Sequence, residues 1–199
     1  MAFLTLGLTG PTGAGKTTVS SFFLEKNIPS VNCDLLSRKV VEPGQPALQE
    51  LVQVFGSSIL LPDGSLDRPG LAAVAFPNPF YKHRMEGILY PKILKLVTQE
   101  IQQARLEGKR AILVDAPTLY ESGADQLCDR VLAVLAPFPL RMERIMARDG
   151  LNPQQALIRI KAQQTDAFYL ERAQDILYND GEPEKLEQQL VSLYRRLFP

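Results

Sequence analysis

Short apolar runs alternate with amphipathic segments along most of the chain, and this pattern predicts alternating strands and helices. Buried strands are expected where the apolar run is short and continuous, at 3–9, 28–33, 110–115, 130–136 and 175–179. Helices are expected where apolar residues recur at helical spacing, as at 16–27, 46–56 and 182–198. Five strands separated by helices favour an α/β fold, with a parallel sheet covered by helices on both faces.

A helix-rich stretch separates the second predicted strand from the third. Residues 61–70 contain many turn formers, and a helical region follows from about 80 to 107, with a break expected at Tyr90-Pro91. We interpret 61–105 as a helical insertion that carries substrate specificity, within a core formed by 1–60 and 106–199. A later helical region, 138–173, is rich in Arg and Gln.

Composition and charge narrow the class of partner. The chain has 22 Lys plus Arg and 22 Asp plus Glu, so no overall charge favours nucleic acid or an anionic membrane surface. The pattern of a secretory signal is not seen, and no run approaches the ~20 apolar residues of a membrane helix. We therefore expect a soluble, cytoplasmic protein that binds a small molecule. Cys33 and Cys128 are expected to be small buried residues, and His83 to lie on the surface.

The segment GPTGAGKTT, residues 10–18, carries the clearest chemistry. It follows a predicted strand, precedes a predicted helix and matches the P-loop pattern G-x4-G-K-T. Glycines let successive backbone N–H groups point at phosphate oxygens, and the start of the helix adds partial positive charge. Lys16 is predicted to reach the β- and γ-phosphates, and the Thr17 hydroxyl to hold Mg²⁺. The predicted ATP-binding residues are Gly13, Ala14, Gly15, Lys16, Thr17 and Thr18.

Missing motifs exclude several P-loop classes. The sequence has no N-K-x-D motif for guanine and no LSGGQ-like segment, which argues against a GTPase and a transporter ATPase. The chain is also too small and too neutral for a helicase core. A kinase with a small-molecule acceptor remains.

Asp34 follows the second predicted strand, so it is expected at the same sheet edge as the P-loop. There a carboxylate can orient an acceptor hydroxyl and take its proton. An alternative role for Asp34 is to cap the helix that begins there, and both roles can coexist. Arg38 lies four residues on, and is either a surface partner of Asp34 or a ligand for a substrate phosphate.

A set of segments follows the P-loop in a consistent order along the chain: DLLSRKVVEPG (34–44), FG (55–56), DGSLDR (63–68), ILYPKI (88–93), DAPTLYESG (115–123), RIKAQ (159–163) and DILYNDG (175–181). This ordered set resembles the dephospho-coenzyme A kinase family over nearly the whole chain. The resemblance implies that ATP phosphorylates the ribose 3′-hydroxyl of dephospho-coenzyme A, giving coenzyme A and ADP, the last step of coenzyme A synthesis.

The same resemblance implies an architecture and residue roles. It implies a three-layer P-loop kinase core, a helical substrate domain at about 60–105 and a lid at 138–165. It makes Asp34 the base, places Arg38, Tyr90 and Pro91 near the substrate, and places Glu121 on the catalytic edge. Arg141, Arg144 and Arg148 share one helix face. Arg141 aligns best with the family's lid arginine, which closes over the triphosphate; the alternative is a solvated basic face.

The chain departs from the family pattern at the start of the P-loop, where it has Gly10-Pro11-Thr12 and the family often has Gly-Gly-Ile, and at two further positions. The family usually has Asp-x-Asp where this chain has Asn32-Cys33-Asp34, and His where this chain has Tyr90. Asp115, at the end of the third strand, is a candidate carboxylate for a water-mediated Mg²⁺ contact; its alternative role is a strand-end cap. These departures leave two other hypotheses open: a kinase for another nucleoside or nucleotide acceptor, and a nucleotide-binding module with weak catalysis. Oligomeric state does not follow from the sequence.

Overall fold

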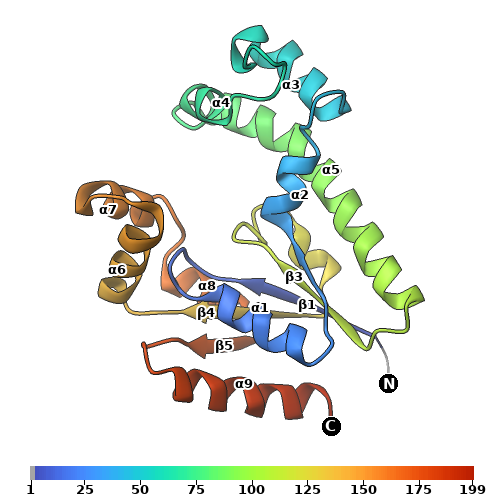
Figure 1. Cartoon of the computed structure of the whole chain (residues 1–199), viewed down its shortest axis with the longest axis vertical. Coiled ribbons are helices and arrows are strands. Elements are labelled where there is room, and N and C mark those ends of the chain that lie inside the picture. Colours follow the sequence, from blue (N-terminus) through green and yellow to red (C-terminus); the bar gives the residue numbers. More distant parts are fainter. Residues whose placement is uncertain (1–2) are drawn as a thin grey trace. The chain divides into compact units, whose positions relative to one another are not determined.

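The computed structural model describes residues 3–199 and divides into two compact units. The core unit runs to Val31 and continues from Ala104 to Pro199, and the helical unit is Asn32–Gln103. Each unit is described by itself below. Figure 1 shows the elements of both along the chain.

The core unit is built on a five-stranded sheet with the order β2-β3-β1-β4-β5. The strands are β1 (Leu4–Thr9), β2 (Ser30–Asn32), β3 (Ala111–Asp115), β4 (Arg130–Leu135) and β5 (Asp175–Tyr178). β1 pairs in parallel with β3 and β4, and β4 pairs in parallel with β5. The predicted α/β fold is therefore confirmed, with β1 at the centre of the sheet. β2 is shorter than predicted because Cys33 already begins a helix.

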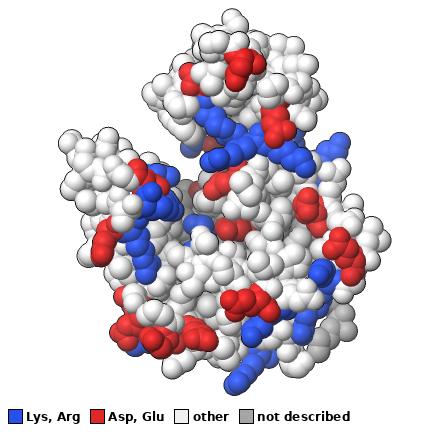
Figure 2. Space-filling view, viewed as in Figure 1, with Lys and Arg blue, Asp and Glu red and all other residues white. Residues whose placement is uncertain are grey.

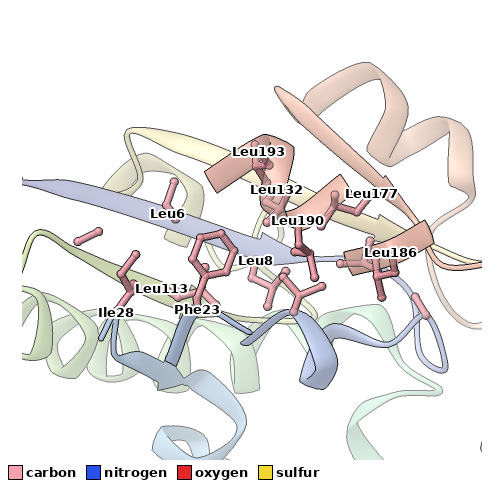
Figure 3. Close-up of a cluster of buried hydrophobic side chains, with 14 of the residues drawn as sticks. Leu6, Leu8, Phe23, Ile28, Leu113, Leu132, Leu177, Leu186, Leu190 and Leu193 are labelled. Carbon is pink, nitrogen blue, oxygen red and sulfur yellow. The ribbon is translucent and has the colours of Figure 1, made fainter. Parts of the chain in front are cut away.

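Helices cover both faces of this sheet, as the alternation of side chains along β4 shows. Leu132 and Val134 join one core cluster, whereas Ala133 and Leu135 join another with Tyr169. The first cluster packs between one face of the sheet and the helices α1 (Lys16–Glu25) and α9 (Pro183–Leu197), as Figure 3 shows. The second packs against α8 (Asp166–Arg172). The unit also contains α6 (Phe138–Asp149), α7 (Pro153–Lys161) and the short η2 (Ala124–Leu127).

The helical unit contains α2 (Cys33–Lys39), α3 (Pro46–Phe55), η1 (Ser57–Ile59), α4 (Arg68–Ala75) and most of α5 (Pro79–Leu106). It begins earlier than the insertion predicted at 61–105, because α2 and α3 bond to the later helices. The Arg68 guanidinium donates to the Ser37 carbonyl at 3.0 Å. The Lys92 ammonium lies 2.8 Å from a Glu50 carboxylate oxygen. These contacts join residues 32–60 to the rest of the helical unit.

The helix break predicted at Tyr90-Pro91 is wrong, because α5 runs without interruption through Pro91. A proline inside a helix removes the hydrogen bond to the carbonyl four residues earlier, which here belongs to Gly87. Both Gly87 and Pro91 are exposed, so water can bond that carbonyl. Within residues 3–199, no helix is long and apolar enough to cross a membrane. His83 is exposed as expected, whereas Cys33 and Cys128 are only partly buried.

The central sheet predicts a sharp contrast between two Leu→Ala substitutions. Leu113 in β3 has no exposed surface, whereas Leu24 on α1 is 63% exposed. Leu113→Ala should lower the free energy of unfolding by about 2–5 kcal/mol through lost burial and a residual cavity. Leu24→Ala should change it by less than about 0.5 kcal/mol. Urea unfolding of the two variants tests the contrast, and equal losses would contradict the packing described here.

Candidate active site

The loop between β1 and α1 has a backbone that only glycine adopts without strain at two key positions. Gly13 and Gly15 have φ angles of 78° and 101°. A Cβ atom on Gly13 would lie 2.9 Å from the Arg141 carbonyl oxygen, and one on Gly15 would lie 2.1 Å from the side-chain nitrogen of Asn179. Both glycines are therefore required by backbone conformation and by close packing of the loop against α6 and the end of β5.

Backbone N–H groups of this loop are available to an anion. Within residues 3–199, the N–H groups of Gly13 and Gly15 donate to no protein acceptor. No side chain caps α1, and the first N–H groups of a helix have no partner within the helix. The Thr12 N–H is different, because it donates to the Gln163 side-chain oxygen at 2.8 Å. The loop thus presents a cradle of donors at a helix start, which fits a phosphate chain.

Lys16 and Arg141 hold the loop from its carbonyl side. Lys16 Nζ donates to the Gly10 carbonyl at 2.8 Å, and Arg141 Nε donates to the Thr12 carbonyl at 3.1 Å. The Arg141 side chain is only 6% exposed and lies 3.5 Å from an Asp166 carboxylate oxygen. Burial lowers the pKa of Arg141, while Asp166 and Tyr169 raise it. The guanidinium remains charged, because an arginine side chain is not deprotonated in proteins.

One nitrogen of Arg141, Nη2, is buried without a hydrogen-bond partner in the described part of the chain. An unpaired donor on a buried cation is costly, so a hydrogen bond from this nitrogen to an anionic oxygen would be favourable. Of the other two arginines on this helix, Arg148 pairs with Asp149 at 2.8 Å and is exposed. Figure 2 shows basic side chains gathered over the α6 region. Arg141 is thus a buried contact of the P-loop, whereas the exposed Arg148 reaches the loop only through a 3.4 Å bond to the Thr12 hydroxyl.

Two candidate oxygen ligands for a divalent cation, Thr17 and Asp115, lie after β1 and at the end of the neighbouring β3. Thr17 is exposed in the first turn of α1, after β1, and Asp115 is the buried last residue of β3. Among residues 3–199, no cluster of three or more His, Cys, Asp and Glu side chains is present. Mg²⁺ is usually held by one or two protein oxygens together with substrate phosphates and water, and this pair of residues fits that pattern.

Glu121 also belongs to the core unit and lies in the turns after β3. Its exposed carboxylate accepts a hydrogen bond from the Gln164 side chain at 3.1 Å. Burial, helped by the charge of Glu121, raises the pKa of Tyr169 to about 12. Glu121 therefore faces the segment between α7 and α8.

The remaining predicted residues lie on the helical unit. Asp34 is exposed in the first turn of α2, where the helix start favours a negative charge. The alternative that Asp34 caps this helix is wrong, because the cap is Asn32, whose side-chain oxygen accepts from the Leu35 N–H at 3.0 Å. Asp34 and Arg38 form no ion pair with each other in the described structure.

The charge of Arg38 acts on a second arginine, Arg68, which lines a cavity. Burial, with a smaller contribution from the charge of Arg38, lowers the pKa of Arg68. A cavity of about 270 Å³ in the helical unit is lined mainly by apolar side chains, with the Arg68 guanidinium and Ser37 among them; the apolar residues are Val41, Leu66, Leu71, Ala72, Phe76, Met85 and Leu89.

Tyr90 and Pro91 lie on α5 of the same unit. The Tyr90 hydroxyl donates to the Glu86 carboxylate at 3.1 Å, and Pro91 is exposed. The sequence-based prediction did not select Asn179 or Gln163, which both bond to the P-loop. Both residues lie in segments that carried the family resemblance, RIKAQ and DILYNDG. The sequence alone does not indicate which backbone group an amide side chain will bond.

Comparison with known proteins identifies a consistent set of relatives. The family model described as dephospho-CoA kinase matches residues 4–185. A dephospho-CoA kinase from Bacillus licheniformis is 36% identical over 190 residues, covering 96% of this chain and 94% of the relative. A crystal structure from Thermus thermophilus is 30% identical with a TM-score of 0.85, covering 100% of both chains. A dephospho-CoA kinase from Campylobacter jejuni has the same fold, with 24% identity, a TM-score of 0.72, and 98% and 97% coverage.

The Asn32 cap predicts how this position responds to substitution. Asn32→Asp should keep the stability of the helical unit, because Asn and Asp are equally good caps. Asn32→Ala should lower it by about 1 kcal/mol, because the Leu35 N–H loses its acceptor. Chemical unfolding of both variants checks this, and an equal loss in the two would mean that the cap bond contributes nothing.

Proposed function

The chain belongs to the dephospho-CoA kinase family, and from that premise we propose that it transfers the γ-phosphoryl group of ATP to the ribose 3′-hydroxyl of dephospho-coenzyme A. The products are coenzyme A and ADP, so the reaction completes coenzyme A synthesis. The observation that carries the proposal is the P-loop, whose free N–H groups at Gly13 and Gly15 form an anion cradle in a chain whose match to the family spans residues 4–185.

On the ATP side, the residues of the core unit position the phosphates and stabilise charge. Residues 13–18 surround the phosphates, with Gly13 and Gly15 binding phosphate oxygens through their N–H groups, and Lys16 exchanges its bond to the Gly10 carbonyl for the β- and γ-phosphates. Arg141 contributes its unpaired Nη2 to the phosphate chain, within the lid at 138–165. Phosphoryl transfer has a loose transition state, so positioning and charge stabilisation supply most of the catalysis.

Thr17 and Asp115 would hold Mg²⁺, Thr17 through its hydroxyl and Asp115 through a water molecule. When bound, the ion neutralises charge on the β- and γ-phosphate oxygens. Asp115 is the protein carboxylate proposed for this role because Asn32, where the family usually has Asp, is already engaged as a helix cap.

On the acceptor side, Asp34 accepts the proton of the 3′-hydroxyl as it attacks the γ-phosphorus. The carboxylate suits this role because it follows the end of β2 and is not consumed by the helix cap or by an ion pair with Arg38 in the described structure. Arg38 binds a phosphate of the acceptor, Tyr90 and Pro91 contact its organic part, and Glu121 lies on the catalytic edge. The 270 Å³ cavity of the helical unit offers an apolar surface for the same acceptor.

The acceptor is tested by ADP release from Mg-ATP with the purified protein. Dephospho-coenzyme A should stimulate release strongly, whereas nucleosides and nucleoside monophosphates should not. Phosphorus NMR of the product should then show a new 3′-phosphomonoester. Stimulation by a member of the nucleoside panel instead would make the chain a kinase for that acceptor, and ATP binding without any stimulation would make it a nucleotide-binding module.

Asp34→Asn and Lys16→Ala separate the two sides of the reaction. Asp34→Asn should leave ATP binding intact and lower kcat by ~10²-fold or more, because an amide cannot take the proton. Lys16→Ala should lower kcat/KM for ATP as well, because the lysine meets charge that grows on the phosphates. ATP titration followed by steady-state kinetics distinguishes the two patterns. Wild-type turnover in Asp34→Asn would show that the base lies elsewhere.

A further inference from the structure

We propose that Asn179 is a positioning residue for ATP, which fixes the P-loop in its anion-binding conformation. The proposal goes beyond the kinase reaction above, since it concerns the protein groups that hold the loop and not the groups that touch the acceptor. It begins from a simple requirement. A loop can turn its N–H groups toward phosphate only if its carbonyl groups turn away and find donors elsewhere, because a carbonyl oxygen facing a phosphate is repelled.

The structure supplies such a donor to each carbonyl from Gly10 to Ala14. The donors for the first three are Lys16 Nζ, the Ala14 N–H and Arg141 Nε. The fourth carbonyl, of Gly13, accepts from an Arg144 guanidinium nitrogen at 3.1 Å. The fifth, of Ala14, accepts from Asn179 Nδ2 at 2.8 Å. Of these donors, Lys16 must leave when it turns to the phosphates, whereas Asn179 has no such second task.

Asn179 also orients the neighbouring donor. Its side-chain oxygen accepts from the second terminal nitrogen of Arg144 at 3.1 Å. One amide therefore holds the Ala14 carbonyl directly and the Gly13 carbonyl through Arg144. Its orientation follows from chemistry, because a carbonyl can only accept and a guanidinium can only donate. No other rotation of the amide satisfies both neighbours.

The position of Asn179 is itself fixed. It is 7% exposed, and its backbone N–H donates to the Leu135 carbonyl at the end of β4 at 2.8 Å. A Cβ atom on Gly15 would lie 2.1 Å from Asn179 Nδ2, so the amide packs directly against the loop where only glycine leaves room. The Asn179 amide is buried and makes two hydrogen bonds. Its removal would therefore take one hydrogen-bond partner from the Ala14 carbonyl and one from the Arg144 guanidinium.

Gln189 provides a matched control, because it is a second amide bonded to the same end of β5. Its side chain accepts from the Tyr178 N–H and donates to the Tyr178 carbonyl, each at 2.9 Å. Gln189 thus supports the residue immediately before Asn179 without any bond to the P-loop. If Asn179 merely stabilises the end of β5, Gln189→Ala and Asn179→Ala should behave alike.

The experiment compares Asn179→Ala, Asn179→Asp and Gln189→Ala. A fluorescent ATP analogue is titrated without acceptor, KM is measured for ATP and for dephospho-coenzyme A, and Tm is recorded. Asn179→Ala should weaken nucleotide binding and raise the KM for ATP by about tenfold or more, the scale of a lost buried bond, while the KM for dephospho-coenzyme A changes by less than about twofold. Gln189→Ala should lower Tm but leave nucleotide binding within about twofold of the wild type.

Asn179→Asp keeps the proposal testable if Asn179→Ala does not fold. Aspartate has nearly the same shape and still accepts from Arg144, but it places a carboxylate oxygen against the Ala14 carbonyl. It should therefore fold and still weaken nucleotide binding by about tenfold or more. Wild-type nucleotide binding in Asn179→Asp, or equal weakening in Gln189→Ala, would overturn the proposal. Because the titration needs no acceptor, its result is independent of whether dephospho-coenzyme A is the substrate.

Discussion

The direction of the peptide groups between Gly10 and Gly15 is the constraint on which the rest of the core unit depends. Within residues 3–199, the N–H groups of Gly13 and Gly15 have no protein acceptor, whereas each carbonyl from Gly10 to Ala14 accepts a hydrogen bond. Those donors come from α1, α6 and the end of β5, which are far apart in the sequence. The sheet order explains how they meet: β1 is central, and β4 and β5 follow on one side, so the segments after these strands reach the same loop.

The arginines of α6 have more specific hydrogen-bond partners than a solvated basic face would have. Arg141 and Arg144 donate hydrogen bonds to the carbonyls of Thr12 and Gly13, whereas Arg148 forms an ion pair with Asp149. A surface ion pair such as the last contributes little, because solvent screens it. The first two are different, because each satisfies a backbone oxygen that would otherwise lack a partner near the nucleotide site. Any movement of α6 as a lid would therefore act on the loop that holds the phosphates.

Much of the architecture could be predicted from the sequence, and the reason is physical. A short continuous apolar run such as AILVD at 111–115 is typical of a strand that is buried on both faces of a sheet. The P-loop pattern in turn predicts the loop after β1. Predictions failed where the surroundings of a residue override a local rule. Pro91 predicted a break, yet α5 continues through it, and both Pro91 and Gly87, whose carbonyl loses its helical partner, are exposed. The helical unit starts at Asn32 because contacts such as Arg68 with Ser37 join segments that the chain order separates.

For the candidate site, too, the sequence indicates residues of a local motif but not residues that act through long-range contacts. Residues of a local motif, such as Lys16 and Thr17, could be proposed from spacing alone, whereas Asn179 acts through a contact across more than a hundred residues that its own segment does not specify. Asn32 is the instructive intermediate case. In the sequence, Asn32 stands where the family usually has a carboxylate, and this left weak catalysis open as a hypothesis. In the structure, its amide oxygen caps α2 as a carboxylate would. The helix that carries Asp34 therefore keeps its start when the first carboxylate is absent, and what the substitution removes is one negative charge near the start of α2, not the scaffold that presents Asp34.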